Sequence, residues 1–206
     1  MMMMTLENWE PKTKLGKAVK KGEVADLDII LESGGKILEP EIVDVLIPDI
    51  KAETILIQPT QRTTDSGRKV SFRAIVAVGD GKGHVGVGVG KSREVGPAVD
   101  YATKQAKKNM IKVKMGCGSW ECQCNQPHSL PRMVVGREGS TVITLKPAPR
   151  GLGLAANDNV KIILKLAGIK DVWSSARGAT DNVYNTVVAT IGALDLLNKI
   201  RPQPEV

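Results

Sequence analysis

The stretch VAVGDGKGHVGVGVGKS, residues 76–92, joins a glycine-rich turn to a run in which valine and glycine alternate strictly. In an extended strand, successive side chains point to opposite faces of the sheet. The run therefore has an apolar face and a bare face, formed by Val85, Val87 and Val89 and by Gly86, Gly88 and Gly90. Because glycine weakens a strand and packs nothing, three in register indicate that another group approaches the backbone closely. Since Lys91 and Arg93 follow at once, we expect the bare face to receive a polyanion.

The segments around this run predict an antiparallel sheet covered by one helix. Two segments rich in β-branched residues precede it, and the polar segment RTTDSGR between them is typical of a turn. After the run, apolar residues recur at helical spacing, and several lysines lie off that stripe. The expected order is strand (53–61), turn (62–68), strand (69–78), tight turn (79–83), strand (84–91) and helix (94–110).

The rest of the chain predicts an arm before this module and a second, β-rich unit after it. In the arm, helices are expected to begin at Thr13 and near Pro40. In the second unit we expect a hairpin about residues 137–139, a helix ending at Gly168 and a last helix capped by Thr180. The fold class is therefore α+β, divided into an N-terminal arm (1–50), a first domain (51–115), a second domain (116–200) and a tail (201–206).

Charge is distributed unevenly along the chain. Residues 1–50 hold 6 Lys and Arg against 10 Asp and Glu, whereas residues 51–115 hold 13 against 5. A positive field of this density favours a nucleic acid or another anionic surface as partner. We expect the acidic arm to contact protein neighbours or basic tails instead of RNA. A merely solvated basic surface is the alternative interpretation.

Composition excludes several classes of protein. No apolar run approaches the ~20 residues needed to cross a bilayer, and the start lacks the apolar core of a secretory signal. Three clustered cysteines do not fit a secreted disulfide framework, and they fit a reducing cytosol. Because the chain has only six aromatic residues, several of them expected in cores, recognition of folded RNA by shape and phosphate fits better than base stacking on single strands.

Neither nucleotide-binding motif in the glycine stretch has the required context. Gly81, Gly83 and Gly86 match the dinucleotide fingerprint, but that motif opens a helix, and here it enters a strand. The segment ending in Lys91 and Ser92 resembles a Walker A loop, but Val85 occupies the position of its first glycine. With two histidines in the chain and no triad or zinc-protease spacing, the sequence predicts a protein that is not an enzyme.

Two arginines outside the first domain are candidate phosphate ligands. Arg150 and Arg177 each lie in a glycine-containing segment shortly before an expected helix. A helix N-terminus attracts anions, and an arginine beside it adds a bidentate donor. The alternative is that both are ordinary solvated loop residues.

A cysteine-rich segment carries a candidate metal site. Its spacing, C-x4-C-x-C-x3-H, supplies three thiols and one imidazole from Cys117, Cys122, Cys124 and His128. Such a set can hold zinc tetrahedrally, although the C-x-C step is tighter than the usual knuckle. Free thiols beside a hydrogen-bonded His128 are the alternative, so no cofactor is required and a structural zinc is a candidate.

Several motifs together resemble one family. The run SFRAIVAVGDGKGHVGVGVGKSREVGPAVDYATKQAKKNMI (71–111) closely resembles the signature of the S-five family of small-subunit ribosomal proteins. PAPRGLGL (147–154), LAGIKDVWS (166–174) and SARG (175–178) resemble the second domain of that family. WEPKTKLGKAVKKG, GCGSWECQC and PHSLP are similar to its archaeal branch.

The resemblance implies a fold, a function and partners. The fold is a double-stranded-RNA-binding-like α-β-β-β-α domain followed by a β-rich α+β domain. The function is that of a structural constituent of the small ribosomal subunit, which binds rRNA and supports assembly and translational accuracy near the side where mRNA enters. Implied partners are small-subunit rRNA, mRNA at its entrance channel, and ribosomal proteins four, eight and three, with protein two as a further candidate. The protein is expected to be cytoplasmic and ribosome-bound, with no membrane partner.

Phosphate contacts are expected from cations and from the glycines of the bare face. The predicted rRNA-binding residues are Arg62, Arg68, Lys69, Arg73, Lys82, Gly86, Gly88, Gly90, Lys91, Arg93, Lys104, Lys107, Lys108, Arg150 and Arg177. Two rival interpretations stay open at this point. One is a free-standing RNA chaperone, and the other is a nucleotide-binding enzyme that uses the glycine stretch.

Overall fold

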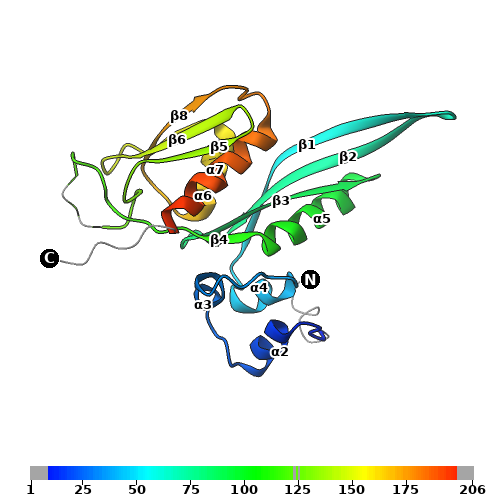
Figure 1. The fold of residues 1–206 in the computed structure, drawn as a ribbon, viewed down its shortest axis with the longest axis horizontal. Helices are drawn as coiled ribbons and strands as arrows, with labels where there is room; N and C mark the ends of the chain where they lie inside the picture. The colour runs from blue at the N-terminus through cyan, green and yellow to red at the C-terminus, as the bar shows by residue number, and fades with distance from the viewer. Residues whose placement is uncertain (1–8, 123, 125, 199–206) are drawn as a thin grey trace.

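The computed structural model describes residues 9–122, 124 and 126–198, so the predicted tail (201–206) lies outside it. Along the chain follow a helical arm, a four-stranded sheet with one helix, and a second four-stranded sheet with two helices (Figure 1). The expected α+β class is confirmed. Among the described residues, no helix is both long and apolar enough to cross a membrane.

Three short helices form the arm: α2 (Lys14–Lys21), α3 (Leu27–Glu32) and α4 (Glu41–Leu46). As predicted, α2 begins at Thr13, whose hydroxyl oxygen accepts a hydrogen bond from the amide of Gly16, and α4 begins after Pro40. The α3 helix was not predicted. The carboxylate of Glu39 holds the arm together, because it accepts hydrogen bonds from the Trp9 indole and from backbone amides of residues 12 and 13.

The first sheet is antiparallel, in the order β1 (Lys51–Thr64), β2 (Gly67–Gly79), β3 (His84–Ser92) and β4 (Met110–Lys112). The tight turn between β2 and β3 is confirmed. The broad turn predicted at 62–68 is wrong in extent, because β1 and β2 stay paired until Thr64 meets Gly67. The two strands therefore form a long hairpin that projects beyond the rest of the sheet (Figure 1).

The helix α5 (Val95–Lys108) covers one face of this sheet. The face it covers is the bare face of β3, so the prediction that Gly86, Gly88 and Gly90 receive a polyanion is wrong. A Cβ atom added at any of these glycines would collide with a backbone carbonyl oxygen of α5, at Ala106, Ala102 and Ala98 respectively. We call these three glycines the glycine strip. The close approach inferred from them is real, but the approaching group is the protein's own helix.

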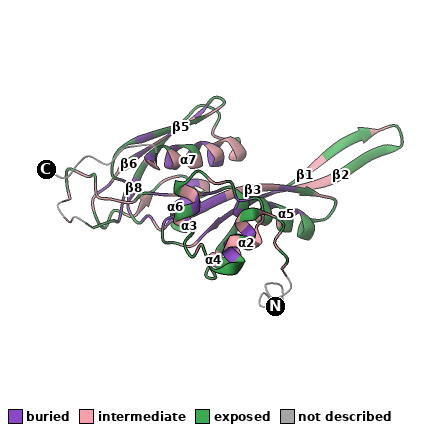
Figure 2. Cartoon of the chain, turned by 60° about the horizontal axis from the view of Figure 1, so that its bottom comes forward, coloured by how far each residue is buried: buried purple, intermediate pink, exposed green. Residues whose placement is uncertain are grey.

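The other face of the first sheet packs against the second domain. Ile75, Ala77 and Val85 are fully buried there, and Val87 and Val89 are half-buried. Their neighbours come from α6 (Asp158–Ala167) and α7 (Val183–Asn198), which continue into the core of the second sheet. Because one apolar core joins both sheets, the strands in the body are buried, whereas the outer part of the hairpin is exposed (Figure 2).

The second sheet has the order β5 (Val134–Glu138), β6 (Thr141–Pro147), β8 (Val172–Arg177) and β7 (Leu154–Ala155). The predicted β5–β6 hairpin is confirmed, and so is the end of α6 at Gly168, which has a left-handed φ of 86°. The prediction that Thr180 caps the last helix is wrong, because α7 begins at Val183. Instead, the side-chain oxygen of Asn182 accepts a hydrogen bond from the amide of Asn185.

Candidate nucleic-acid interface and metal centre

The exposed tip of the β1–β2 hairpin, residues 60–71, carries the predicted binding residues Arg62, Arg68 and Lys69. Arg62 lies directly opposite Lys69 in the ladder, so the two cations share one face, while Arg68 points to the other. Like charges in directly opposed positions destabilise a hairpin. Within the described residues, neither cation takes part in an ion pair. The hairpin tip therefore holds positive charge that an external anion would balance.

A second pair of cations lies where the hairpin meets the body of the sheet. Arg73 on β2 is directly opposite Lys91 on β3. The guanidinium of Arg73 lies 4.8 Å from the ring centre of Tyr184 on α7, a cation–π contact between the two domains. Arg73 is half-buried by this contact, whereas Lys91, Arg93 and Lys82 are exposed. The structure therefore gives Arg73 a role inside the protein as well as a place beside the exposed cations.

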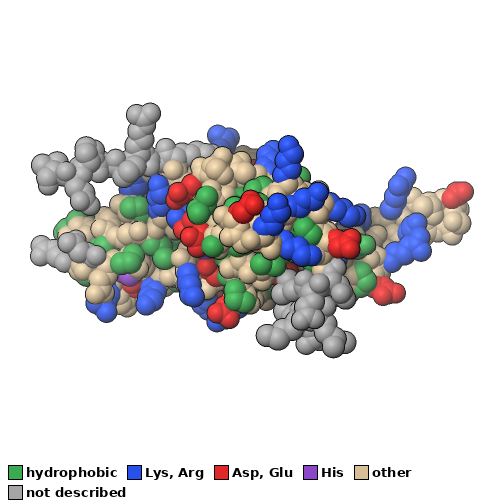
Figure 3. Space-filling model, turned by 90° about the horizontal axis from the view of Figure 1, so that it is seen from below, with side chains coloured by type: hydrophobic (Ala, Val, Ile, Leu, Met, Phe, Trp, Pro, Cys, Tyr) green, Lys and Arg blue, Asp and Glu red, His purple; other side chains and the backbone are tan. Residues whose placement is uncertain are grey.

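The three lysines predicted on α5 do not share one environment. Lys104 and Lys108 are exposed, and Lys and Arg side chains extend from the body of the molecule onto the hairpin in Figure 3. Lys107 is only 8% exposed, and its Nζ lies 2.6 Å from Oδ1 of Asp44 in the arm. Lys107 therefore holds the arm against the first domain, and its prediction as an RNA ligand is wrong.

The acidic arm neutralises basic groups of its own chain, which the sequence interpretation missed. Beside β3, the ring of His84 lies between two carboxylates, with Nδ1 2.6 Å from Asp80 and Nε2 2.7 Å from Asp28 of α3. Asp28 also binds Lys112 of β4 at 2.6 Å. The hydrogen bond to Asp80 raises the pKa of His84; burial opposes this, and Asp28 reinforces it. Protonated His84 thus ties the arm to the sheet.

The glycine stretch offers no nucleotide site. Gly86, Gly88 and Gly90 pair with β2 along one edge of β3, and α5 closes the face above them. A phosphate-binding loop needs free backbone N–H groups at the start of a helix. Here the stretch is an internal strand, so neither the dinucleotide fingerprint nor the Walker-like segment has the geometry that its chemistry requires.

Arg150 and Arg177 are both exposed, but neither lies at a helix start. The strand β7 separates Arg150 from α6, and Arg177 is the last residue of β8. The expected contribution of a helix N-terminus to phosphate binding is therefore absent at Arg150 and at Arg177. Their candidacy as phosphate ligands now depends on their own guanidinium groups.

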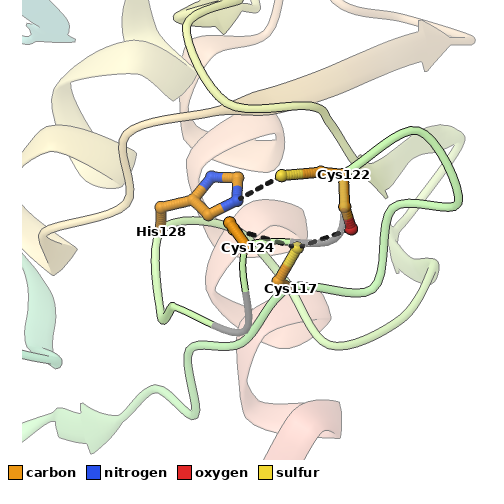
Figure 4. Close-up of side chains that lie close together, drawn as sticks. All are labelled: Cys117, Cys122, Cys124 and His128. Atoms are coloured by element: carbon orange, nitrogen blue, oxygen red, sulfur yellow. Dashed lines mark hydrogen bonds between the residues drawn. The ribbon is translucent and has the colours of Figure 1, made fainter.

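The four predicted metal ligands come together in the loop after β4 (Figure 4). Their ligand atoms all lie within 4.8 Å of one another, with 3.6 Å between the sulfurs of Cys117 and Cys124. Sγ of Cys122 lies 3.7 Å from Nε2 of His128. In a tetrahedral site with Zn–S bonds of about 2.3 Å, neighbouring sulfurs lie about 3.8 Å apart. Two of the separations are therefore close to the tetrahedral value, and the remaining ligand atoms lie within 4.8 Å.

The protonation states of these ligands also suit a metal. Hydrogen bonds from the Cys124 thiol and from the backbone N–H groups of Arg150 and Cys124 lower the pKa of Cys122 to about 6. Burial raises the pKa of the Cys117 thiol, which a cation would reverse. Nδ1 of His128 lies 2.8 Å from Oδ2 of Asp171, and Nε2 faces the sulfur of Cys122. A carboxylate behind a histidine ligand is the usual support of a zinc site.

The sequence interpretation also missed an exposed aromatic hollow beside this loop. Trp120 and Trp173 line a depression of about 190 Å³ together with Pro147 and Pro149. Trp120 is 90% exposed and Trp173 48% exposed, and Tyr101 on α5 is exposed as well. The expectation that several aromatic residues lie in cores holds for the other three, because Trp9, Phe72 and Tyr184 are half-buried and pack against apolar cores.

Two family models match the chain: ribosomal protein S5, N-terminal domain, at residues 50–114, and ribosomal protein S5, C-terminal domain, at residues 136–205. The chain belongs to the ribosomal protein S5 family. The resemblance drawn from residues 71–111 is thus confirmed. As an S5 protein the chain has a structural role in the ribosome, is not an enzyme, and binds rRNA and other ribosomal components.

Archaeal S5 proteins match almost the whole chain. The small ribosomal subunit protein uS5 of Methanocaldococcus jannaschii is 52% identical over 97% of this chain and 92% of its own length. The proteins of the same name from Methanothermobacter thermautotrophicus and Pyrobaculum calidifontis are 50% and 48% identical, over 97% and 94% of this chain and 93% and 96% of theirs. The arm and the cysteine loop, which lie outside the two family models, are within this similarity.

Proposed function

We propose that this S5 protein is a structural constituent of the small ribosomal subunit that binds rRNA through phosphate and shape recognition. The contacts come from the exposed cations of the hairpin tip, from the end of β3 and from the outer face of α5: Arg62, Arg68, Lys69, Lys82, Lys91, Arg93, Lys104 and Lys108. The observation that carries the proposal is the opposed pair Arg62 and Lys69 on a projecting hairpin, because an isolated protein gains nothing from it. When RNA phosphates lie on both sides of the hairpin, each of these cations is attracted to a phosphate, and this attraction outweighs the repulsion between Arg62 and Lys69.

The same proposal places the protein in the subunit. Bound through the hairpin, it locks rRNA helices into one arrangement, supports assembly, and affects translational accuracy near the side where mRNA enters. Its proposed neighbours are ribosomal proteins four, eight and three, and protein two, in cytoplasmic ribosomes. Family membership supports this placement. Arg150 and Arg177 supply phosphate contacts from the second domain.

A charge reversal at the end of β3 tests the proposal. The change Lys91→Glu with Arg93→Glu should weaken binding of small-subunit rRNA, transcribed from the Methanocaldococcus jannaschii gene, by about tenfold or more at 0.1 M salt. It should also reduce the slope of log affinity against log salt by about 2, because each of the two cations neutralises one phosphate. The matched control is Lys14→Glu with Lys17→Glu, which makes the same charge change on exposed residues of α2. Unchanged affinity and slope, or an equal effect in the control, would contradict the proposal.

We also propose that Cys117, Cys122, Cys124 and His128 hold a structural zinc ion. The fit of their separations to tetrahedral zinc supports this. Metal analysis of the purified full chain should give about one zinc per protein. The variant Cys122→Ser should lose most of it, whereas Gln126→Ala, in an exposed residue of the same loop, should retain it. Metal-free wild-type protein prepared in the presence of zinc would refute the site.

A further inference from the structure

A continuous set of hydrogen bonds, buried at His128 and Asp171 and part-buried at the other end, leads from the cysteine–histidine cluster to the segment that carries Arg150. Oδ2 of Asp171 accepts the Nδ1–H of His128 at 2.8 Å. The other oxygen of the same carboxylate, Oδ1, accepts the amides of Gly151 at 3.1 Å and Gly153 at 2.8 Å. We call residues 150–153 the Arg150 loop. One carboxylate therefore binds a candidate metal ligand with one oxygen and this loop with the other.

A second link joins the loop to the cluster from the opposite side. The backbone N–H of Arg150 faces the sulfur of Cys122. The Arg150 loop is thus next to one ligand residue, Cys122, and hydrogen-bonded through Asp171 to another, His128.

The middle of the connection is buried. Asp171 is 4% exposed and His128 is 5% exposed. The amides of Lys170 and Asp171 both donate to the backbone oxygen of His128, which fixes the two residues relative to each other. The loop itself has little regular structure, and Gly151 and Gly153 both have left-handed φ values, 92° and 77°. Its conformation therefore depends on the carboxylate that holds its amides.

At the outer end of this connection is a free cation. The Arg150 side chain is exposed, and among the described residues it takes part in no ion pair or side-chain hydrogen bond. We infer that the zinc site and the Arg150 loop form one functional unit, in which the ligated cluster fixes the loop so that the Arg150 guanidinium is presented to an rRNA phosphate. This inference rests on the proposed function, since it takes both the zinc site and the phosphate contact as given.

Arg177 provides an internal comparison. It is also exposed and predicted to bind phosphate, but it lies at the end of β8, where Val142 of β6 pairs with it. No hydrogen bond in the described residues joins it to the cysteine loop. Its position is set by the sheet, so it should not respond to the metal.

Amide exchange tests the connection without any RNA. In the zinc-loaded full chain, the amides of Gly151 and Gly153 should exchange at least about tenfold more slowly than after removal of zinc by a chelator. Amides of β2 and β3 should be unaffected and serve as the reference. The variant Asp171→Asn should lose this protection with zinc present, because its side-chain NH₂ or oxygen cannot serve both His128 and the two amides. If the wild type binds zinc but loop exchange is the same with and without it, the inference fails while the zinc site stands.

A binding cycle then tests the consequence for RNA. Arg150→Ala should weaken binding of small-subunit rRNA by about threefold to tenfold in zinc-loaded protein, and by less than about twofold in zinc-free protein. Arg177→Ala should have the same effect in both forms. If Arg150→Ala has equal effects with and without zinc, the coupling is refuted although Arg150 still binds RNA. If Arg150→Ala has no effect in a protein whose loop zinc protects, the assigned phosphate contact is wrong, and the inference falls with it.

Discussion

The glycine strip of β3 and the hairpin tip of β1 and β2 belong to one sheet, yet the structure places them in opposite environments. The glycine strip is sealed beneath α5, where bare backbone lets the helix approach closely. The hairpin tip is exposed on both faces and carries cations that face one another. Residues that are unusual for a strand thus serve packing in one place and, in the proposed function, binding in the other. The glycines are buried and the cations are exposed.

The largest expected effect comes from a methyl group on the glycine strip. Gly88→Ala would bring a Cβ atom against backbone atoms of Ala102 and Ala106, which cannot move without displacing the helix. We expect it to lower the free energy of unfolding in urea by about 3 kcal/mol. Gly192→Ala, in an exposed position of α7, is the matched control, because a Cβ there meets nothing within 4 Å, and it should stabilise that helix by about 0.5–1 kcal/mol. Equal stability of the two variants would show that the strip is not closely packed.

Two adjacent lysines of α5 allow the same comparison between a buried residue and an exposed one within a single turn of helix. Lys107→Gln removes the buried partner of Asp44 and should lower stability by about 1–2 kcal/mol while leaving rRNA affinity unchanged. Lys108→Gln changes an exposed residue, so stability should stay within about 0.5 kcal/mol while rRNA affinity falls by about twofold to threefold. Urea unfolding and filter binding on both variants measure this. A loss of affinity in Lys107→Gln without a loss of stability would reverse the assignment.

Much of this fold could be predicted from the sequence because its signals are local. The turn at 79–83, the cap at Thr13 and the helix end at Gly168 each depend on residues within one turn of chain. Alternation in β3 identified a bare face, but nothing local reveals which segment covers it. The length of the β1–β2 hairpin was underestimated because its outer part buries nothing and so shows no apolar pattern.

In the candidate site, too, the contacts between residues close in sequence could be predicted, and those between distant segments could not. The metal ligands lie within twelve residues of one another, so their spacing indicated them. The pairing of Lys107 with Asp44 and of His128 with Asp171 spans 63 and 43 residues, and no local pattern predicts such contacts. The domain limits at 50, 115 and 200, and the RNA contacts themselves, stay predictions.

The ion pairs of His84 with Asp28 of the arm and with Asp80 should make the free energy of unfolding depend on pH. The exposed cations should not have this effect. The pKa of His84 is raised in the folded protein, so its contribution is complete below the unfolded value of about 6.5 and is lost as the pH rises through the folded value. Burial favours protonated Asp80 and Asp28, but hydrogen bonds from His84, and from Lys112 to Asp28, outweigh it and lower both pKa values. Their contribution is therefore present above about pH 4 and lost as the pH falls further.

Urea unfolding from pH 5.5 to 9 measures the contribution of the His84 ion pairs to stability. The wild type should lose about 1 kcal/mol of stability as His84 deprotonates, and His84→Gln should show a flatter profile. Identical profiles for the two proteins would mean that His84 does not tie the arm to the sheet.

The central claim is that the opposed cations of the hairpin tip, Arg62 and Lys69, bind rRNA phosphates. It is tested most directly by Arg62→Glu. This change turns a like-charge pair with Lys69 into an opposite-charge pair, so the free protein should gain about 0.5 kcal/mol of stability. Its affinity for small-subunit rRNA at 0.1 M salt should fall by about threefold to tenfold, more than for Lys14→Glu on the arm. Stability and affinity moving in opposite directions is the predicted result; an affinity equal to that of the wild type would contradict the claim.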